Sequence, residues 1–90
     1  MILVDRPIWH GHGRLWSHLV SDESHEELHE FAAAVGVPRH GFQGDHYDIP
    51  EQLYETVVAA GAVPVSSREL VRRLREAGLR SPRSDRRAQP

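Results

Sequence analysis

The spacing of hydrophobic residues changes along the chain, and it predicts strands first and helices later. Residues 2–5 form an apolar run that ends in an acid, which is typical of a short buried strand. Residues 15–20 alternate with a period of two, which predicts a second strand with two distinct faces. One face carries Leu15, Ser17 and Leu19, and the other carries Trp16, His18 and Val20. The proline and two glycines within residues 6–13 favour a loop between these strands.

Two segments show a helical spacing of three and four residues, each behind a serine that can cap it. Ser24 and Glu27 predict a capping box for the first helix, although Asp22 could cap it instead, and Ser66 and Glu69 predict one for the last. The inward positions of the first helix are Leu28, Phe31, Ala32 and Val35, and those of the last are Leu70, Val71, Leu74 and Ala77. Gly36 and Gly78 end the two helices.

The middle of the chain mixes loop, strand and helix signals. Residues 37–45 read as a loop that leads into a brief strand over residues 46–49. Pro50 predicts the first turn of a helix that closes at Gly61, with Asp48 as its N-cap. Residues 62–65 predict a final strand, and Pro64 favours an edge position because proline has no N–H to give to a sheet.

Strands and helices therefore alternate along most of the chain. This order predicts a small single α/β domain over residues 1–79, with a short mixed sheet of about four strands and three helices. Residues 80–90 have almost no apolar content and predict a disordered, arginine-rich tail.

Composition narrows the class of protein. Ninety residues leave room for one modest core, and cysteine is absent, so neither disulfides nor thiolate metal sites can support it. The apolar runs are too short to span a membrane, and the absence of cysteine is compatible with a cytoplasmic location. The tail holds four arginines and one aspartate, which leaves a net charge of −5 on the rest of the chain. An acidic body argues against a dedicated binder of duplex DNA.

Seven histidines are an unusual number for 90 residues, and the segment DHYD at residues 45–48 contains one of them. In an extended segment, His46 and Asp48 project to one face and Tyr47 to the other, so imidazole and carboxylate lie together. The alternative is that Asp48 only caps a helix, a role worth about 1 kcal/mol.

Three residues outside that segment are further candidates. Asp5 ends the first buried strand, where ligands gather in open α/β sheets, although it could simply cap a turn before a proline. His18 lies between apolar strand neighbours and is either a hydrogen-bonded core residue or a ligand. His12 lies between two glycines, where the backbone can approach a ligand closely.

Two other motifs give weaker signals. His25 and His29 are four residues apart in HEELH, which matches the letters of a zinc-protease motif without an evident third ligand, so boundary histidines on a short helix explain them better. Arg68, Arg72 and Arg75 form a basic stripe on the last helix, which is typical of a solvated face and could also contact RNA.

The segments HGRLWSHLVSD, ELHEFA, DHYDIP and AAGAVPVSSRELVRRL, in this order, resemble a bacterial and phage family of small proteins, domain of unknown function 4031. The resemblance covers about residues 2–79 and implies no activity or cofactor. It implies that His10, His25 and His40 are variable positions. The resemblance also implies which residues occupy the motif positions of the family: His12, Trp16, Ser17, His18, Asp22, His29, His46, Tyr47 and Asp48.

These observations lead to two hypotheses. The first is a domain that binds a divalent metal (Zn, Mn or Mg) and acts on a phosphoester or nucleotide, with ligands Asp5, His18, His46 and Asp48, and with His12 or Tyr47 transferring a proton or orienting the substrate. The second is a non-enzymatic module that binds nucleic acid or a protein partner through an aromatic and arginine surface containing Trp9, Trp16, Phe42 and Tyr47. The expected edge strand is compatible with a homodimer.

Overall fold

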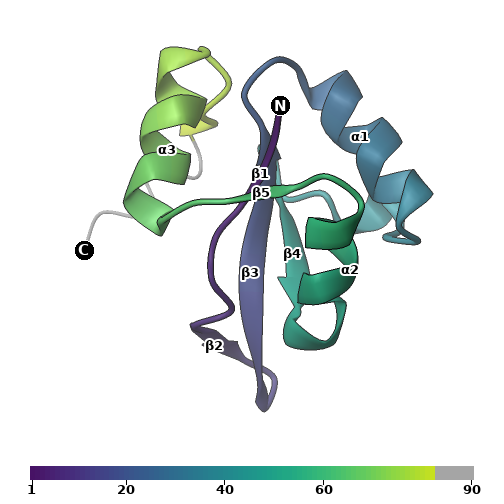
Figure 1. Cartoon of the computed structure of the whole chain (residues 1–90). Coiled ribbons are helices and arrows are strands. Elements are labelled where there is room, and N and C mark those ends of the chain that lie inside the picture. Colours follow the sequence, from purple (N-terminus) through teal and green to yellow (C-terminus); the bar gives the residue numbers. More distant parts are fainter. Residues whose placement is uncertain (83–90) are drawn as a thin grey trace.

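A computed structural model describes residues 1–82 as a five-stranded mixed sheet between two layers of helices (Figure 1). The helix α3 covers one face of the sheet, and α1 and α2 cover the other. The strands are β1 (Ile2–Val4), β2 (Trp9–Gly11), β3 (Arg14–Ser21), β4 (Tyr47–Pro50) and β5 (Val63–Pro64). The α-helices are α1 (His25–Ala34), α2 (Tyr54–Ala59) and α3 (Ser67–Glu76), and short 3-10 turns span Arg39–Gly41 and Glu51–Leu53. The predicted α/β class and mixed sheet are confirmed.

The long strand β3 is the centre of the sheet. It pairs antiparallel with β1, β2 and β4, whereas β5 runs parallel to β1. Because β4 pairs with residues 16–19, which overlap the partners of both β1 and β2, these two strands must share the other edge of β3. Pro64 therefore lies in an edge strand, as its missing N–H predicted.

The alternation predicted for residues 15–20 separates two hydrophobic cores. Leu19 packs beneath α1 and α2, in the larger cluster with Ile2, Val4, Leu28, Ala32, Tyr47, Ile49, Val57 and Ala62. Val20 points the other way, in the smaller cluster with Leu3, Leu70 and Leu74 beneath α3. Burial of both faces explains why β1 is apolar throughout.

Serine side chains begin both long helices, as predicted. The Ser24 hydroxyl accepts a hydrogen bond from the Glu27 N–H at 3.0 Å, and that of Ser66 from the Glu69 N–H at 3.1 Å. The glutamates do not return the bond in the manner of a capping box, because Glu27 bonds Ser21 and Glu69 bonds Arg72.

Two local predictions were wrong. Residues 6–13 are not all loop, because β2 forms a hairpin with the start of β3. Asp48 does not cap a helix: it lies inside β4, and α2 begins only at Tyr54, without a side-chain cap. Pro50 has the extended conformation (φ −66°, ψ 150°), so it ends the strand, and a 3-10 turn precedes the helix. None of the helices within residues 1–82 is long and apolar enough to cross a membrane.

The fold predicts opposite effects for two Ser→Ala changes. Ser17 is fully buried opposite Ile49, and its hydroxyl has no hydrogen-bond partner within the described residues. Ser17→Ala should therefore raise the free energy of unfolding by about 1 kcal/mol, since it removes an unsatisfied polar group. Ser66→Ala should lower it by about 1 kcal/mol, since it removes a cap. Urea unfolding of both variants measures this, and a destabilised Ser17→Ala would contradict it.

Candidate metal centre

Antiparallel pairing brings three ligand-type side chains together on the α3 face of the sheet. His18 in β3 stands directly opposite Asp48 in β4, and His46 lies two residues before Asp48, so its side chain projects to the same face. The nitrogen and oxygen atoms that the three residues offer lie within 4.8 Å of one another. His46 Nε2 is 3.2 Å from Asp48 Oδ1, which confirms that these two side chains share a face.

An irregularity in the sheet turns Asp5 toward His18. The register changes between Val4, opposite Leu19, and Trp9, opposite Trp16, so residues 5–8 face only residues 17 and 18. Asp5 N–H still donates to the His18 carbonyl at 3.2 Å, but the His18 N–H donates to Asp5 Oδ1 at 2.6 Å. The carboxylate thus takes the place of a backbone carbonyl in the ladder.

The other Asp5 oxygen holds the His18 ring. Oδ2 accepts from His18 Nδ1 at 2.8 Å, from the Ser67 hydroxyl at 2.7 Å and from Trp9 Nε1 at 3.2 Å. Burial alone would raise the pKa of Asp5, but the hydrogen bonds from His18 and Ser67 outweigh it and lower the pKa. Because an ionised carboxylate only accepts, Nδ1 of His18 carries the proton and Nε2 is left to face the cluster. Asp5 was expected to be a metal ligand, but it lies outside the group of three ligand-type side chains, and its carboxylate instead holds the His18 ring.

Asp45 plays the same part for His46. Its Oδ1 is 2.7 Å from His46 Nδ1, and the side chain is fully buried. Its Oδ2 accepts from the Ser81 N–H at 2.7 Å and lies 3.7 Å from Arg80 Nη1. Burial raises the pKa of Asp45, and the bonds from His46 and Ser81 outweigh it, so the net direction is downward. Two buried carboxylates therefore fix two imidazoles.

His46 sits between two carboxylates. Burial by itself would lower its pKa, but the hydrogen bonds to Asp45 and Asp48 prevail and raise the pKa of His46 to about 9. At neutral pH a proton therefore lies between Nε2 and Asp48. This is a place where positive charge is stabilised.

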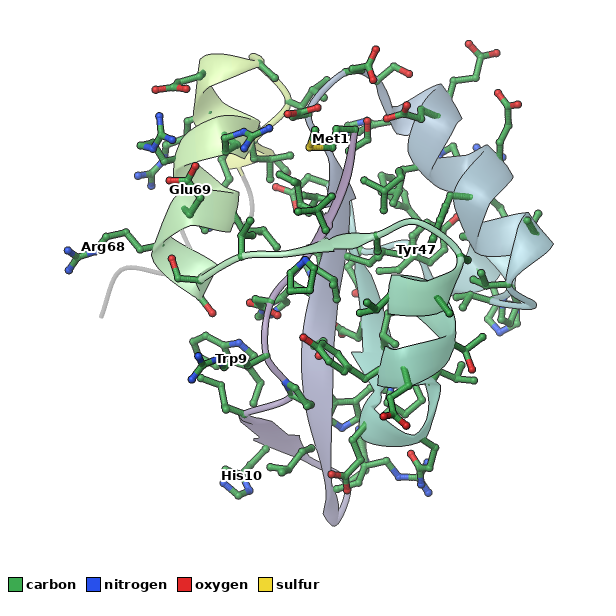
Figure 2. All side chains as sticks on the ribbon, viewed as in Figure 1. Met1, Trp9, His10, Tyr47, Arg68 and Glu69 are labelled. Atoms are coloured by element: carbon green, nitrogen blue, oxygen red, sulfur yellow. The ribbon has the colours of Figure 1, made fainter. Side chains whose placement is uncertain are left out.

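The two residues predicted to transfer protons do not join the cluster. Tyr47 projects to the opposite face, as the pleat of an extended segment predicted, and there it is fully buried and 2.7 Å from His29 Nδ1 (Figure 2). His12 lies at the turn between β2 and β3 with φ +50°. The start of β3 at Arg14 is four residues from His18, or about 13 Å along the strand. A role for His12 stays a prediction.

The other motifs from the sequence form no second centre within the described residues. His29 is engaged with Tyr47, and only one group of three ligand-type residues occurs in residues 1–82. The arginine stripe of α3 is partly neutralised, because Arg72 pairs with both Glu69 and Glu76. The expected aromatic surface is wrong as well, since Phe42 and Tyr47 pack in the larger core while Trp9 lies on the α3 side.

A cavity of about 440 Å³ opens beside the two histidines, between the sheet and α3. Figure 2 shows Trp9 and Arg68 on this side of the molecule and Tyr47 on the other. The residues that line the cavity are Asp5, Trp9, His18, Val20, Asp45, His46, Ser67, Arg68, Leu70, Val71, Leu74 and Arg80. A small molecule in this cavity would contact both imidazoles.

The sequence did not point to several of the residues that support the cluster. Asp45 belongs to the DHYD segment, but no local pattern predicts its contact with Ser81, which is 36 residues away. Ser67 follows the cap of α3, 62 residues from Asp5. Arg80 and Ser81 belong to the segment for which the sequence predicts a disordered tail, yet both contact Asp45. Residues 83–90 of that segment lie outside the described part of the chain.

Truncation at two points separates these contacts from the rest of the C-terminal segment. Deletion of residues 83–90 keeps the contacts of Arg80 and Ser81 to Asp45, and this variant is the reference for the comparison. Deletion of residues 80–90 also removes Arg80 and Ser81 from Asp45, and should lower the affinity by about 10-fold, the lower range for outer contacts of metal ligands. Isothermal titration with zinc measures both, and equal affinities would contradict the prediction.

Comparison with known proteins places the chain in a family. No curated protein and no solved structure matches it. One family model matches residues 2–77, which include every residue of the cluster as well as Asp5 and Asp45. Arg80 and Ser81 lie beyond the match. The chain belongs to the family described as "Protein of unknown function (DUF4031)".

Proposed function

We propose that this protein binds one divalent metal ion through His18, His46 and Asp48 and hydrolyses a phosphoester, such as that of a nucleotide. The observation that carries the proposal is the pair of buried carboxylates, each bonded to Nδ1 of one histidine, with both rings converging on Asp48. Metal-binding histidines almost always donate their second ring N–H to such an acceptor. Asp5 and Asp45 thus supply the outer contacts that a metal site requires.

The donor set favours zinc among the three metals considered. Two imidazoles and one carboxylate suit zinc, whereas magnesium prefers oxygen ligands alone. Three protein ligands also leave a position open, as in zinc hydrolases, where the metal activates a water molecule. The proton now stabilised between His46 and Asp48 would leave when the cation binds.

The surroundings of the cluster support a phosphorylated substrate. Arg68 and Arg80 line the adjacent cavity, so cationic groups stand on the same side as the histidines. Phosphate oxygens accept hydrogen bonds from guanidinium groups particularly well. A non-enzymatic module that binds nucleic acid remains the second proposal, and the pairing of Arg72 weakens its support.

The proposal is tested in two steps, first by metal content and then by catalytic turnover. Untagged protein should carry, or take up, one equivalent of zinc or manganese, as measured by elemental analysis and isothermal titration. The zinc form should then hydrolyse 4-nitrophenyl phosphate or bis(4-nitrophenyl) phosphate, and a chelator should stop the reaction. Absence of metal binding would refute the whole proposal, and tight retention of nucleic acid would then favour the binding module. Binding without hydrolysis of either ester would refute the enzymatic part.

A further inference from the structure

The cavity beside the cluster has two chemically different walls. One wall is polar and holds His18 and His46 with the carboxylates that orient them. The other is apolar: Val71 of α3 is partly exposed there, and the buried side chains of Val20, Leu70 and Leu74 pack behind it. A ligand that fills the cavity must therefore be apolar at one end and polar at the other.

The apolar wall belongs to the smaller of the two cores. Only Leu3, Val20, Leu70 and Leu74 are buried in that cluster. The space of about 440 Å³ lies over this buried cluster and opens to solvent, so it is a groove on the surface rather than a void in the core. Its volume falls within the range of small-molecule sites, about 300 to 1,000 Å³.

The volume also limits the size of the apolar group. A cavity of about 150 Å³ lined by aliphatic residues is enough to hold benzene. The space beneath α3 can therefore take an aromatic ring together with a small head group. Trp9, whose ring centroid is 5.1 Å from that of His18, adds an aromatic surface at the polar end.

The charges that line the cavity determine how a ligand would be oriented in it. Asp5 accepts four hydrogen bonds, and Asp45 is engaged by His46, Ser81 and Arg80, so both carboxylates are compensated within the protein. Arg68 of α3, together with a cation bound at His18, His46 and Asp48, would then add positive charge to the cavity. An anionic head group belongs at this wall.

We propose that the cavity selects phosphate monoesters of an aromatic alcohol or of a ring system of similar size, with the ring against Val71 and the apolar side chains packed behind it. This rests on the proposed function, because the phosphate is placed at the metal bound by His18, His46 and Asp48. It goes further in assigning α3 as the element that determines specificity.

Two esters of equal charge test the proposal on the zinc-loaded protein. Phenyl phosphate should bind at least about 10-fold more tightly than methyl phosphate in isothermal titration, since only its ring can reach the apolar wall. Val71→Trp fills the cavity and should reduce phenyl phosphate to the affinity of methyl phosphate. Val63→Trp, at an exposed valine in β5 that does not line the cavity, is the control.

The outcomes separate this proposal from the proposed function. Equal affinity for the two esters, or an unchanged preference in Val71→Trp, would overturn the specificity of the cavity even if zinc binds. If zinc does not bind, the proposed function fails, and phenyl phosphate is added to metal-free protein instead. The methyl NMR signals of Val20, Leu70, Val71 and Leu74 should still shift more than those of Val57 in the other core, and no such difference would overturn the cavity as an aryl site.

Discussion

Asp48→Asn is expected to lower zinc affinity by at least about 100-fold and to leave the fold intact. Asparagine keeps the shape of the side chain but removes its charge, so only His18 and His46 would remain as strong ligands. Loss of an outer contact already reduces metal affinity by about 10- to 100-fold, and loss of a ligand should exceed that. The Asp48 side chain is 42% exposed, so stability should change little.

Glu26→Gln is the control for this change. Glu26 is an exposed acid in the HEELH segment of α1, which covers the face of the sheet opposite the cluster. The zinc affinity of the Glu26→Gln variant should equal that of the wild type in a competition titration with a coloured chelator. A loss of less than about threefold in Asp48→Asn would show that Asp48 is not a ligand, and a loss in Glu26→Gln would move the site to α1.

The metal-free protein is expected to lose stability as the pH rises from 6.5 to 8. The folded-state pKa of His46, about 9, exceeds the usual value of 6.5, so the folded state holds its proton more tightly than the unfolded state. This stabilisation is fully present below pH 6.5 and is lost as the pH rises through about 9. Within the first 1.5 pH units the loss should be on the order of 1 to 2 kcal/mol.

Urea unfolding in the presence of a chelator measures this loss. Measurements stop at pH 8 because the N-terminal amine, whose pKa is raised from 8.0 to about 10, contributes in the same direction above it. In His46→Gln the fall between pH 6.5 and 8 should be much smaller than in the wild type, although the variant is less stable throughout. An equal slope in wild type and variant would mean that His46 does not hold the proton.

The burial of two carboxylates argues for a site rather than for a purely structural role. Removal of an ionised group from water is strongly unfavourable unless hydrogen bonds and charge compensate it, and buried ion pairs are often no better than apolar residues for stability. A chain of 90 residues has little core with which to offset such groups. Asp5 and Asp45 nevertheless both hold histidines of one cluster.

Local patterns predicted much of the fold and part of the candidate centre. The alternation of residues 15–20 and the serine caps at Ser24 and Ser66 depend on near neighbours, and the structure confirms them. The shared face of His46 and Asp48 follows from the pleat of any extended segment. These features required no knowledge of long-range contacts.

The remaining features of the fold and of the candidate site depend on contacts between residues far apart in the sequence. The sequence before Pro50 favoured a helix cap at Asp48, but the pairing of this residue with His18 keeps it in the sheet. The role of Asp5 depends on the register change at residues 5–8, which appears only when β1 and β2 pair with the same strand. The contact of Ser81 with Asp45 likewise exists only in the folded chain.

Imidazole NMR provides the most direct test of the metal centre. The Nε2 resonances of all seven histidines can be followed in a long-range ¹H–¹⁵N correlation spectrum while one equivalent of zinc is added. Nε2 of His18 and of His46 should shift together and strongly, while Nδ1 of each keeps its proton toward Asp5 or Asp45 and the other five histidines remain unchanged. If neither signal shifts, or if zinc moves His25 and His29 instead, the proposed centre is wrong.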